Sequence, residues 1–339
     1  IKKLIFDIKN SRPVLTKTGL ELNTIYFWWW TPSILKEKDL LQILNTIKET
    51  FKLSKNIEIT LETTPQNISL WNINIWEKLW FNRVSVWIQT LNKKALKEIN
   101  RWDLDSIFYA LELLNNSNIE NIWVDFILGL PYVEFLQTYK YIENIIKKYK
   151  NIKHISIYML EDYYDIQKNE ENSFEKIIYP NKWSELWLID EDIILEYNKI
   201  SALLENNWFL KYELSNFAKI WYECKHNIWY WEHKEYLWFW LWAHSFINNT
   251  RYAYNSNFEK YYSWELEYIE ILTKKDLIIE KLMFLLRTSW IWKEYIKFLD
   301  KDQLNFYIAK WYLIESENKI KISKTWVWVI DYILKEILV

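Results

Sequence analysis

Short hydrophobic runs recur through the first half of the chain, and each is followed by a segment with helical periodicity. The runs begin at Asn23, Ile57, Arg83, Asn121 and His154, so their starts are 34, 26, 38 and 33 residues apart. Spacing of about 30 residues is typical of βα units that form a parallel sheet or barrel. The pattern therefore predicts an α/β fold.

The second half of the chain has a different pattern. A polar stretch, "YYDIQKNEENSFEKIIYPNKWSE", predicts a surface loop or domain boundary, and a helical run follows from Asp190 to Trp208. From about Leu272 the order is helix, helix, a small hairpin in "YLIESENKIKIS", and a closing helix, which is typical of a winged-helix-like module. We therefore expect a barrel in residues 1–165, an extension in 166–265 and a C-terminal module in 266–339.

The composition changes this picture, because the chain has 24 Trp and only 2 Gly. Ordinary proteins contain about 7% glycine. UGA is translated as tryptophan in some genetic codes and as glycine in others, so translation with the wrong code would exchange the two residues. The alternative is a true tryptophan-rich, noncatalytic binding module.

The positions of the tryptophans favour the exchange. Trp80, Trp208 and Trp311 each follow a helical run and precede an apolar residue, where helices usually place a left-handed glycine. Tryptophan also alternates in "LWFWLWAHS", at Trp238, Trp240 and Trp242. We interpret most tryptophans as glycine positions. We expect positive φ or exposed side chains at Trp28 to Trp30, Trp80, Trp208, Trp238, Trp240 and Trp311.

Charge, hydropathy and cysteine content narrow the function classes. The formal net charge is −2, so no basic surface for nucleic acid or anionic membranes is expected. No apolar run reaches about 18 residues and no leader is visible, which favours a cytoplasmic protein. Cys224 is the single cysteine, so no disulfide framework and no iron–sulfur cluster held by this chain alone is expected.

Polar residues stand at the ends of three successive predicted strands. Glu62 closes "IEITLE", Gln89 closes "RVSVWIQ", and Asp125 lies in "WVDFILGLP". The carboxyl ends of parallel barrel strands form one face, where ligands bind. Any one of these residues alone is more often a loop-capping residue, but together they predict a binding site.

A series of motifs then identifies a family. The chain contains, in order, "YFWWWTPS", "ITLETTPQ", "RVSVWIQT", "WVDFILGLP", "HISIYMLE", "YELSNFA", "CKHNIWYW" and "YLWFWLWAHS". With glycine at most tryptophans, this series resembles the radical S-adenosylmethionine (SAM) proteins related to oxygen-independent coproporphyrinogen III oxidase. The resemblance covers essentially the whole chain.

The resemblance implies a partial (β/α) barrel that holds a [4Fe-4S] cluster and SAM. Three cysteines in a C-x-x-x-C-x-x-C loop ligate the cluster in the family, and this loop is absent here. Because the chain begins at Ile1 rather than Met, we expect the loop upstream of Ile1. The residues matched to the family's SAM site are Trp28, Trp29 and Trp30 (as glycine), Thr31, Glu62, Gln89, Arg101 and Asp125. Asp103 stands where the family often has histidine, which leaves the outer edge of this site open.

The segment "HNIWYW" resembles a motif of the family's haem chaperone branch. It implies haem binding by His226, Asn227 and Trp231, with Trp231 a true tryptophan. Judged from the residues alone, a buried loop histidine and a core tryptophan are the alternative. Cys224 and His244 are interpreted as structural.

The first hypothesis is therefore a haem chaperone that passes haem to an unidentified acceptor protein, with a membrane-associated acceptor among the options. The second is an oxygen-independent coproporphyrinogen III dehydrogenase. Whether the chain is an enzyme stays open.

Overall fold

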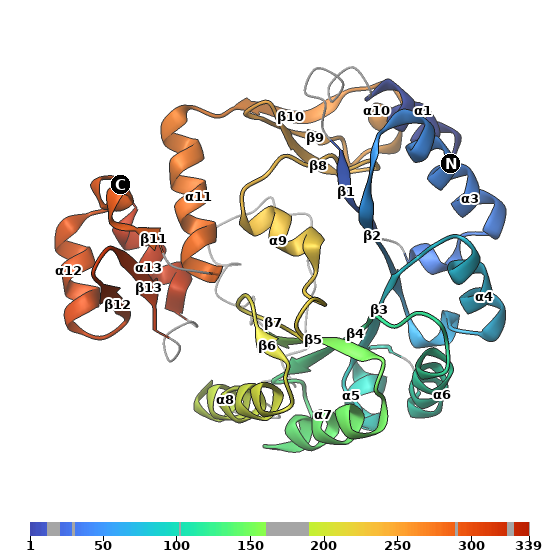
Figure 1. Cartoon of the computed structure of the whole chain (residues 1–339), viewed down its shortest axis with the longest axis horizontal. Helices are drawn as coiled ribbons and strands as arrows, with labels where there is room; N and C mark the ends of the chain where they lie inside the picture. The colour runs from blue at the N-terminus through green and yellow to red at the C-terminus, as the bar shows by residue number, and fades with distance from the viewer. Residues whose placement is uncertain are drawn as a thin grey trace.

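A computed structural model describes residues 1–11, 21–28, 31–101, 103–160, 190–288, 291–323 and 329–338. Its largest sheet is curved, with strand order β1-β2-β3-β4-β5-β7-β6 (Figure 1). The five parallel strands are β1 (Leu22–Phe27), β2 (Leu53–Thr63), β3 (Arg83–Gln89), β4 (Ile122–Leu128) and β5 (Ile152–Met159). All five begin within four residues of the predicted starts. The predicted α/β fold is confirmed.

Helices cover the outer, convex side of this sheet (Figure 1). The helices of this half are α1 (Lys2–Asn10), α3 (Glu37–Thr50), α4 (Leu70–Lys78), α5 (Lys93–Glu98), α6 (Leu104–Asn115), α7 (Gln137–Lys148) and α8 (Asp190–Asn206), with short 3-10 turns at Pro32–Ile34 and Pro65–Asn67. Val84, Val86 and Ile88 on β3 are all fully buried, because strands of a covered parallel sheet are apolar on both faces. The predicted polar loop lies in 161–189, outside the described residues.

One helix lies on the inner, concave side of the sheet. This helix, α9 (Lys225–Trp231), follows the antiparallel strands β6 (Leu210–Lys211) and β7 (Asn216–Ala218) (Figure 1). A second sheet of β8 (His244–Ile247), β9 (Thr250–Tyr254) and β10 (Leu266–Ile271) then closes the open side, with α10 (Phe258–Tyr262) between β9 and β10.

The C-terminal part has its own hydrophobic core. Its elements are α11 (Lys274–Thr288), β11 (Ile291–Trp292), a 3-10 helix (Lys293–Phe298), α12 (Lys301–Ala309), β12 (Leu313–Ser316), β13 (Lys319–Ile322) and α13 (Ile330–Ile337). The strands form a sheet of order β11-β13-β12, and β12 and β13 are the predicted hairpin. The predicted order of elements is confirmed, while the proposed domain boundaries stay predictions.

Many tryptophans have the backbone expected of glycine. Seven tryptophans among the described residues have positive φ: Trp80, Trp208, Trp221, Trp240, Trp242, Trp264 and Trp311. The expectation is confirmed for Trp80, Trp208, Trp240 and Trp311, and Trp28 is exposed. Trp238 is an exception, because it is partly buried and is not among the positive-φ residues. Trp29 and Trp30 lie outside the described residues.

Candidate functional site

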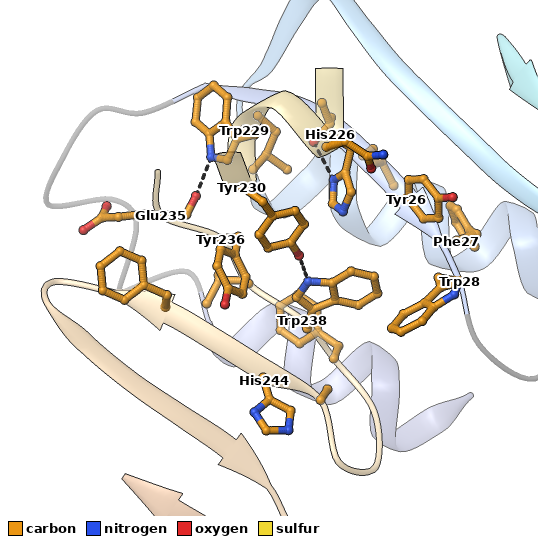
Figure 2. A pocket seen from close by; sticks show the side chains of 18 of the residues that line it. Tyr26, Phe27, Trp28, His226, Trp229, Tyr230, Glu235, Tyr236, Trp238 and His244 are labelled. Atoms are coloured by element: carbon orange, nitrogen blue, oxygen red, sulfur yellow. Dashed lines mark hydrogen bonds between the residues drawn. The ribbon is translucent and has the colours of Figure 1, made fainter. Parts of the chain in front are cut away.

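The concave side of the curved sheet encloses a cavity of about 1500 Å³. Its walls include β1, the end of β2, α9 and the segment from Glu232 to Phe246, and residues of α1, α3 and α11 line it as well. Most of the lining is aromatic or aliphatic, and Figure 2 shows several of these side chains pointing into one space. Ordinary ligand pockets measure about 300–1,000 Å³, so this cavity is large enough for a ligand above drug size.

Glu62 lies at the end of β2 and lines the cavity. The Tyr26 hydroxyl donates a hydrogen bond of 2.8 Å to its Oε1 atom. Its Oε2 atom is buried and has no partner among the described residues. Burial raises the pKa of Glu62 to about 8, and the nearby Asp125 carboxylate also raises it. A cationic or hydrogen-donating ligand group would satisfy Oε2 and favour the ionised form.

Gln89, Arg101 and Asp125 form a cluster beyond Glu62. Oδ1 of Asp125 accepts hydrogen bonds from the backbone N–H groups of Ile88 (2.7 Å) and Gln89 (3.1 Å). Nε of Arg101 donates to Oε1 of Gln89 at 2.8 Å. Burial raises the pKa of Asp125 to about 6, against the opposing effect of these hydrogen bonds.

The structure therefore brings the four predicted polar residues toward one edge of the sheet, but only Glu62 lines the cavity itself. Of the residues matched to the SAM site after β1, Trp28 and Thr31 also line it. Thr31 has a left-handed backbone, with φ of 54°. Asp103 is the N-cap of α6, where its carboxylate accepts a hydrogen bond from the backbone N–H of Ser106.

His226 faces the cavity from the first turn of α9 (Figure 2). Its Nδ1 atom lies 3.1 Å from Oγ1 of Thr24, with which it forms a hydrogen bond. Its Nε2 atom is buried and has no partner among the described residues. Burial lowers the pKa of His226 to about 3, so the imidazole is neutral at physiological pH. When Nδ1 donates to Thr24, Nε2 presents its lone pair, which is the form that ligates metals.

Aromatic rings surround this imidazole. Tyr26 stacks on it with ring centroids 4.7 Å apart, and the Tyr230 and Trp238 rings lie 4.9 Å and 5.6 Å away. The Trp238 indole N–H donates a hydrogen bond to the Tyr230 hydroxyl, and Trp28 packs edge-on against Trp238 (Figure 2).

A buried ion pair that was not predicted from the sequence anchors α9 to the sheet. Arg83 Nη1 lies 3.1 Å from Glu58 Oε2, and both side chains are buried. Arg83 donates to the carbonyl oxygens of Tyr222 and Glu223, while Glu58 accepts from the backbone N–H groups of Lys225 and His226. The sequence did contain a signal for this pair, because Glu58 and Arg83 are charged residues within two segments that were predicted as strands.

Not all of the motif on α9 reaches the cavity. Asn227 lines it, but Trp231 does not, because the Trp231 ring packs against Phe284 of α11 with centroids 5.9 Å apart. Five helical positions separate Trp231 from His226, which puts them on different faces, whereas Tyr230 is four positions away and shares the face of His226. We therefore correct the interpretation of Trp231 as a residue beside the ligand. Tyr230 and Trp229 were missed, although this spacing could have indicated Tyr230.

Comparisons with known proteins agree with this architecture. Residues 15–148 match the model of the radical SAM superfamily. This part of the chain is therefore similar to a radical SAM domain. The heme chaperone HemW of Lactococcus lactis is 29% identical over 68% of this chain and 59% of its own length. HemW of Buchnera aphidicola from Acyrthosiphon pisum is 29% identical over 85% of this chain and 74% of its own length. The motifs, this domain match and these relatives together support a HemN-like radical SAM family of the HemW type.

A solved structure supports the fold. Coproporphyrinogen III oxidase (HemN) of Escherichia coli superposes with a TM-score of 0.77, covering 98% of this chain and 81% of the oxidase at 16% identity. The curved seven-stranded sheet is thus the half-barrel of this radical SAM fold.

The residues present suit some of the expected ligands, namely SAM and haem, but not the [4Fe-4S] cluster. Radical SAM proteins use three cysteines for a [4Fe-4S] cluster, whereas this chain supplies only Cys224, which is buried against Glu58. No group of three or more His, Cys, Asp or Glu suited to a metal ion occurs among the described residues, so the chain as it stands does not fit the cluster. The partnerless atoms of Glu62 and His226 do fit an organic cation and a metalloporphyrin. Across the described part of the chain, no helix is long and apolar enough to cross a membrane.

Proposed function

We propose that the protein is a haem chaperone, which binds haem in the cavity beside His226 and passes it to an acceptor protein. The observation that carries this proposal is the neutral imidazole of His226 in a large aromatic cavity, where its buried Nε2 atom lacks a partner among the residues that the structure describes. A neutral imidazole nitrogen is a common axial ligand of haem iron. Aromatic walls favour a flat, apolar macrocycle.

Sequence relationship supports the same proposal. The relatives from Lactococcus and Buchnera are both named heme chaperones. The Lactococcus match covers less than two thirds of that protein, so the activity and the partners are proposed here rather than transferred. The acceptor, with a membrane-associated protein among the options, and a cytoplasmic location are parts of the proposal.

SAM is the second proposed ligand, bound at the strand ends. When bound, SAM supplies a cationic sulfonium and a methionine end with an ammonium and a carboxylate. Oε2 of Glu62 would accept from the ammonium group, while Tyr26 holds Oε1 in place. Gln89, oriented by Arg101, and Asp125, oriented by backbone N–H groups, would position the rest of the cofactor.

His226→Ala tests the haem proposal. The test uses the glycine form, defined as the chain with glycine at positions 28–30, 80, 208, 238, 240 and 311. Loss of an axial ligand should weaken haem binding by about tenfold or more, equivalent to about 1.4 kcal/mol, and change the visible spectrum of the bound haem. Affinity is measured by titration with haem under absorbance detection.

His244→Ala is the matched control, because His244 also lines the cavity but is not among the described residues with a buried, unpartnered ring nitrogen. It should leave haem affinity nearly unchanged. Equal haem affinity in the parent and the His226→Ala variant would contradict the proposal. Turnover of coproporphyrinogen III by a form that carries the family's three-cysteine loop and its cluster would instead favour the dehydrogenase.

A further inference from the structure

Four helices of this chain end in the same way, with tryptophan in the left-handed conformation. In α4, the backbone N–H of Phe81 donates to the carbonyl of Trp76 (3.0 Å), and that of Trp80 donates to Glu77 (3.0 Å). This pair of bonds is the Schellman motif, whose left-handed residue is usually glycine. The same pair of bonds occurs at the ends of α8, α10 and α12, with Trp208, Trp264 and Trp311 in the left-handed place.

Two further helices show what this position accepts when it is not tryptophan. Asn100 after α5 and His233 after α9 have φ of 53° and complete the same bond pattern. Asn and His are among the non-glycine residues that tolerate positive φ, whereas a bulky residue there is a true outlier. The indoles of Trp80, Trp208 and Trp311 are about three-quarters exposed, at 74%, 74% and 76%, so packing does not compensate for the strain.

The segment that carries Trp238 has the same backbone character. Trp240 and Trp242, two and four residues further on, have φ of 143° and 56°. The first value lies in a region that is nearly exclusive to glycine. All three tryptophans line the cavity. This segment is therefore a glycine-type loop that runs along the cavity wall beside His226.

We propose that the left-handed tryptophans and the tryptophans of this loop are glycine positions, and that glycine at 28 and 238 opens a slot onto Nε2 of His226. The identity of the ligand that would enter this slot, a flat metallomacrocycle, rests on the proposed function. It arises because the Trp238 ring lies 5.6 Å from the imidazole and the Trp28 ring lies 5.2 Å from Trp238. Two indoles thus fill the space in front of the one cavity histidine whose Nε2 is buried and lacks a partner among the described residues (Figure 2).

The other rings around His226 would remain and shape the slot. Tyr26 stacks on the imidazole and is held by Glu62, and Tyr230 lies one helical turn from His226. Without the Trp238 side chain, the Tyr230 hydroxyl loses its indole partner and becomes available to a polar group of the ligand. Bare backbone on the opposite wall lets a planar ring approach closely.

Two sets of substitutions distinguish the effect of glycine in the slot from the effect of glycine at the helix ends. The slot variant carries Trp28→Gly and Trp238→Gly. The matched control carries Trp80→Gly, Trp208→Gly and Trp311→Gly, at helix ends whose residues do not line the cavity. The first readout is the rate at which diethyl pyrocarbonate modifies His226, measured by peptide mass, because it needs no haem. The second readout is haem affinity.

In the slot variant, modification of His226 should accelerate on the order of tenfold, since a covered group reacts only through local opening. The control should modify His226 at the parent rate. A His226 that stays equally protected in the slot variant overturns the slot, whatever happens to haem. A reactive His226 without His226-dependent haem binding supports the slot and overturns the haem proposal. Trp238→Gly alone serves if the double variant does not fold.

Peptide masses of the protein isolated from its natural host test the glycine assignment. The peptides that contain positions 80, 208, 238 and 311 should have the mass expected for glycine, with UGA at the matching codons. Tryptophan masses with UGG codons would overturn this assignment, and would favour the tryptophan-rich binding module.

Discussion

Glu62 on one side of the cavity and His226 on the other each present one buried polar atom that has no partner in the described part of the chain, but different contacts hold the two residues in place. Glu62 and its neighbours Gln89 and Asp125 stand on successive parallel strands, so the strand order itself aligns them. His226 stands on a short helix whose first turn is bound by Glu58, while Arg83 binds the residues just before it and Thr24 binds the imidazole. The strand-end side is thus formed by segments that follow one another in the sequence. The α9 side is formed by contacts between segments that are far apart in the sequence.

The two sides also differ electrostatically. Burial keeps a proton on Glu62 up to about pH 8, whereas it keeps a proton off His226 down to about pH 3. Both groups are therefore neutral without ligand at physiological pH, and a cation on one side or a metal on the other would change that balance. One cavity can in this way discriminate between an organic cation and a metal-centred ligand.

The largest expected effect comes from Arg83→Met, which breaks the anchor of the α9 side. Removing one partner of a buried ion pair leaves an unpaired charge and costs about 3–5 kcal/mol. Denaturant unfolding measures the loss, and haem affinity should fall more than SAM affinity. As a control, Lys78→Met removes a partner of Glu37 in an exposed pair and should cost about 1 kcal/mol or less. Equal losses from both variants would show that the anchor carries no special stability.

Glu62→Gln is expected to have a smaller, pH-dependent effect on the strand-end side. The folded pKa of Glu62 is raised from 4.5 to about 8, so the folded protein holds this proton after the unfolded chain has released it. Its contribution to stability is complete below about pH 4.5 and is lost as the pH rises to about 8. The cleanest window is pH 6.5 to 8, above the raised pKa of Asp125 at about 6 and the ordinary histidine pKa of 6.5.

Unfolding by urea across that window measures this slope. Stability of the parent chain should fall toward pH 8, and the Glu62→Gln variant should lose this component. An identical slope in both proteins would mean that Glu62 is ionised in the folded state.

The smallest effect is expected from Trp80→Gly, which should change neither side of the cavity. Left-handed backbone costs a residue with a side chain about 1–2 kcal/mol, so glycine should stabilise the protein by roughly that amount. Trp76→Ala on the same helix is the control, because Trp76 is 1% exposed and its removal should cost about 3–5 kcal/mol. Thermal unfolding of the two variants should therefore shift in opposite directions, and destabilisation by Trp80→Gly would count against the glycine assignment.

The strand-end side could be predicted from the sequence because its information is local. Each βα unit repeats the same hydrophobic pattern, and parallel strands place their carboxyl ends together, so Glu62, Gln89 and Asp125 were expected on one edge. Three of the four left-handed tryptophans at helix ends, Trp80, Trp208 and Trp311, were predicted for the same reason, since a helix terminus is defined by a few consecutive residues.

The α9 side depended on the tertiary structure. The helix α9 and the place of Tyr230 beside His226 were not predicted from the sequence, although helical spacing puts the two residues on one face once the helix is known. Only the folded chain decided that this face meets the cavity while Trp231 turns to α11, because residues far apart in sequence, Thr24, Glu58 and Arg83, fix the orientation of the helix. Spacing along a chain specifies faces, but the choice of which face is buried belongs to long-range packing and to the pairing of buried charges.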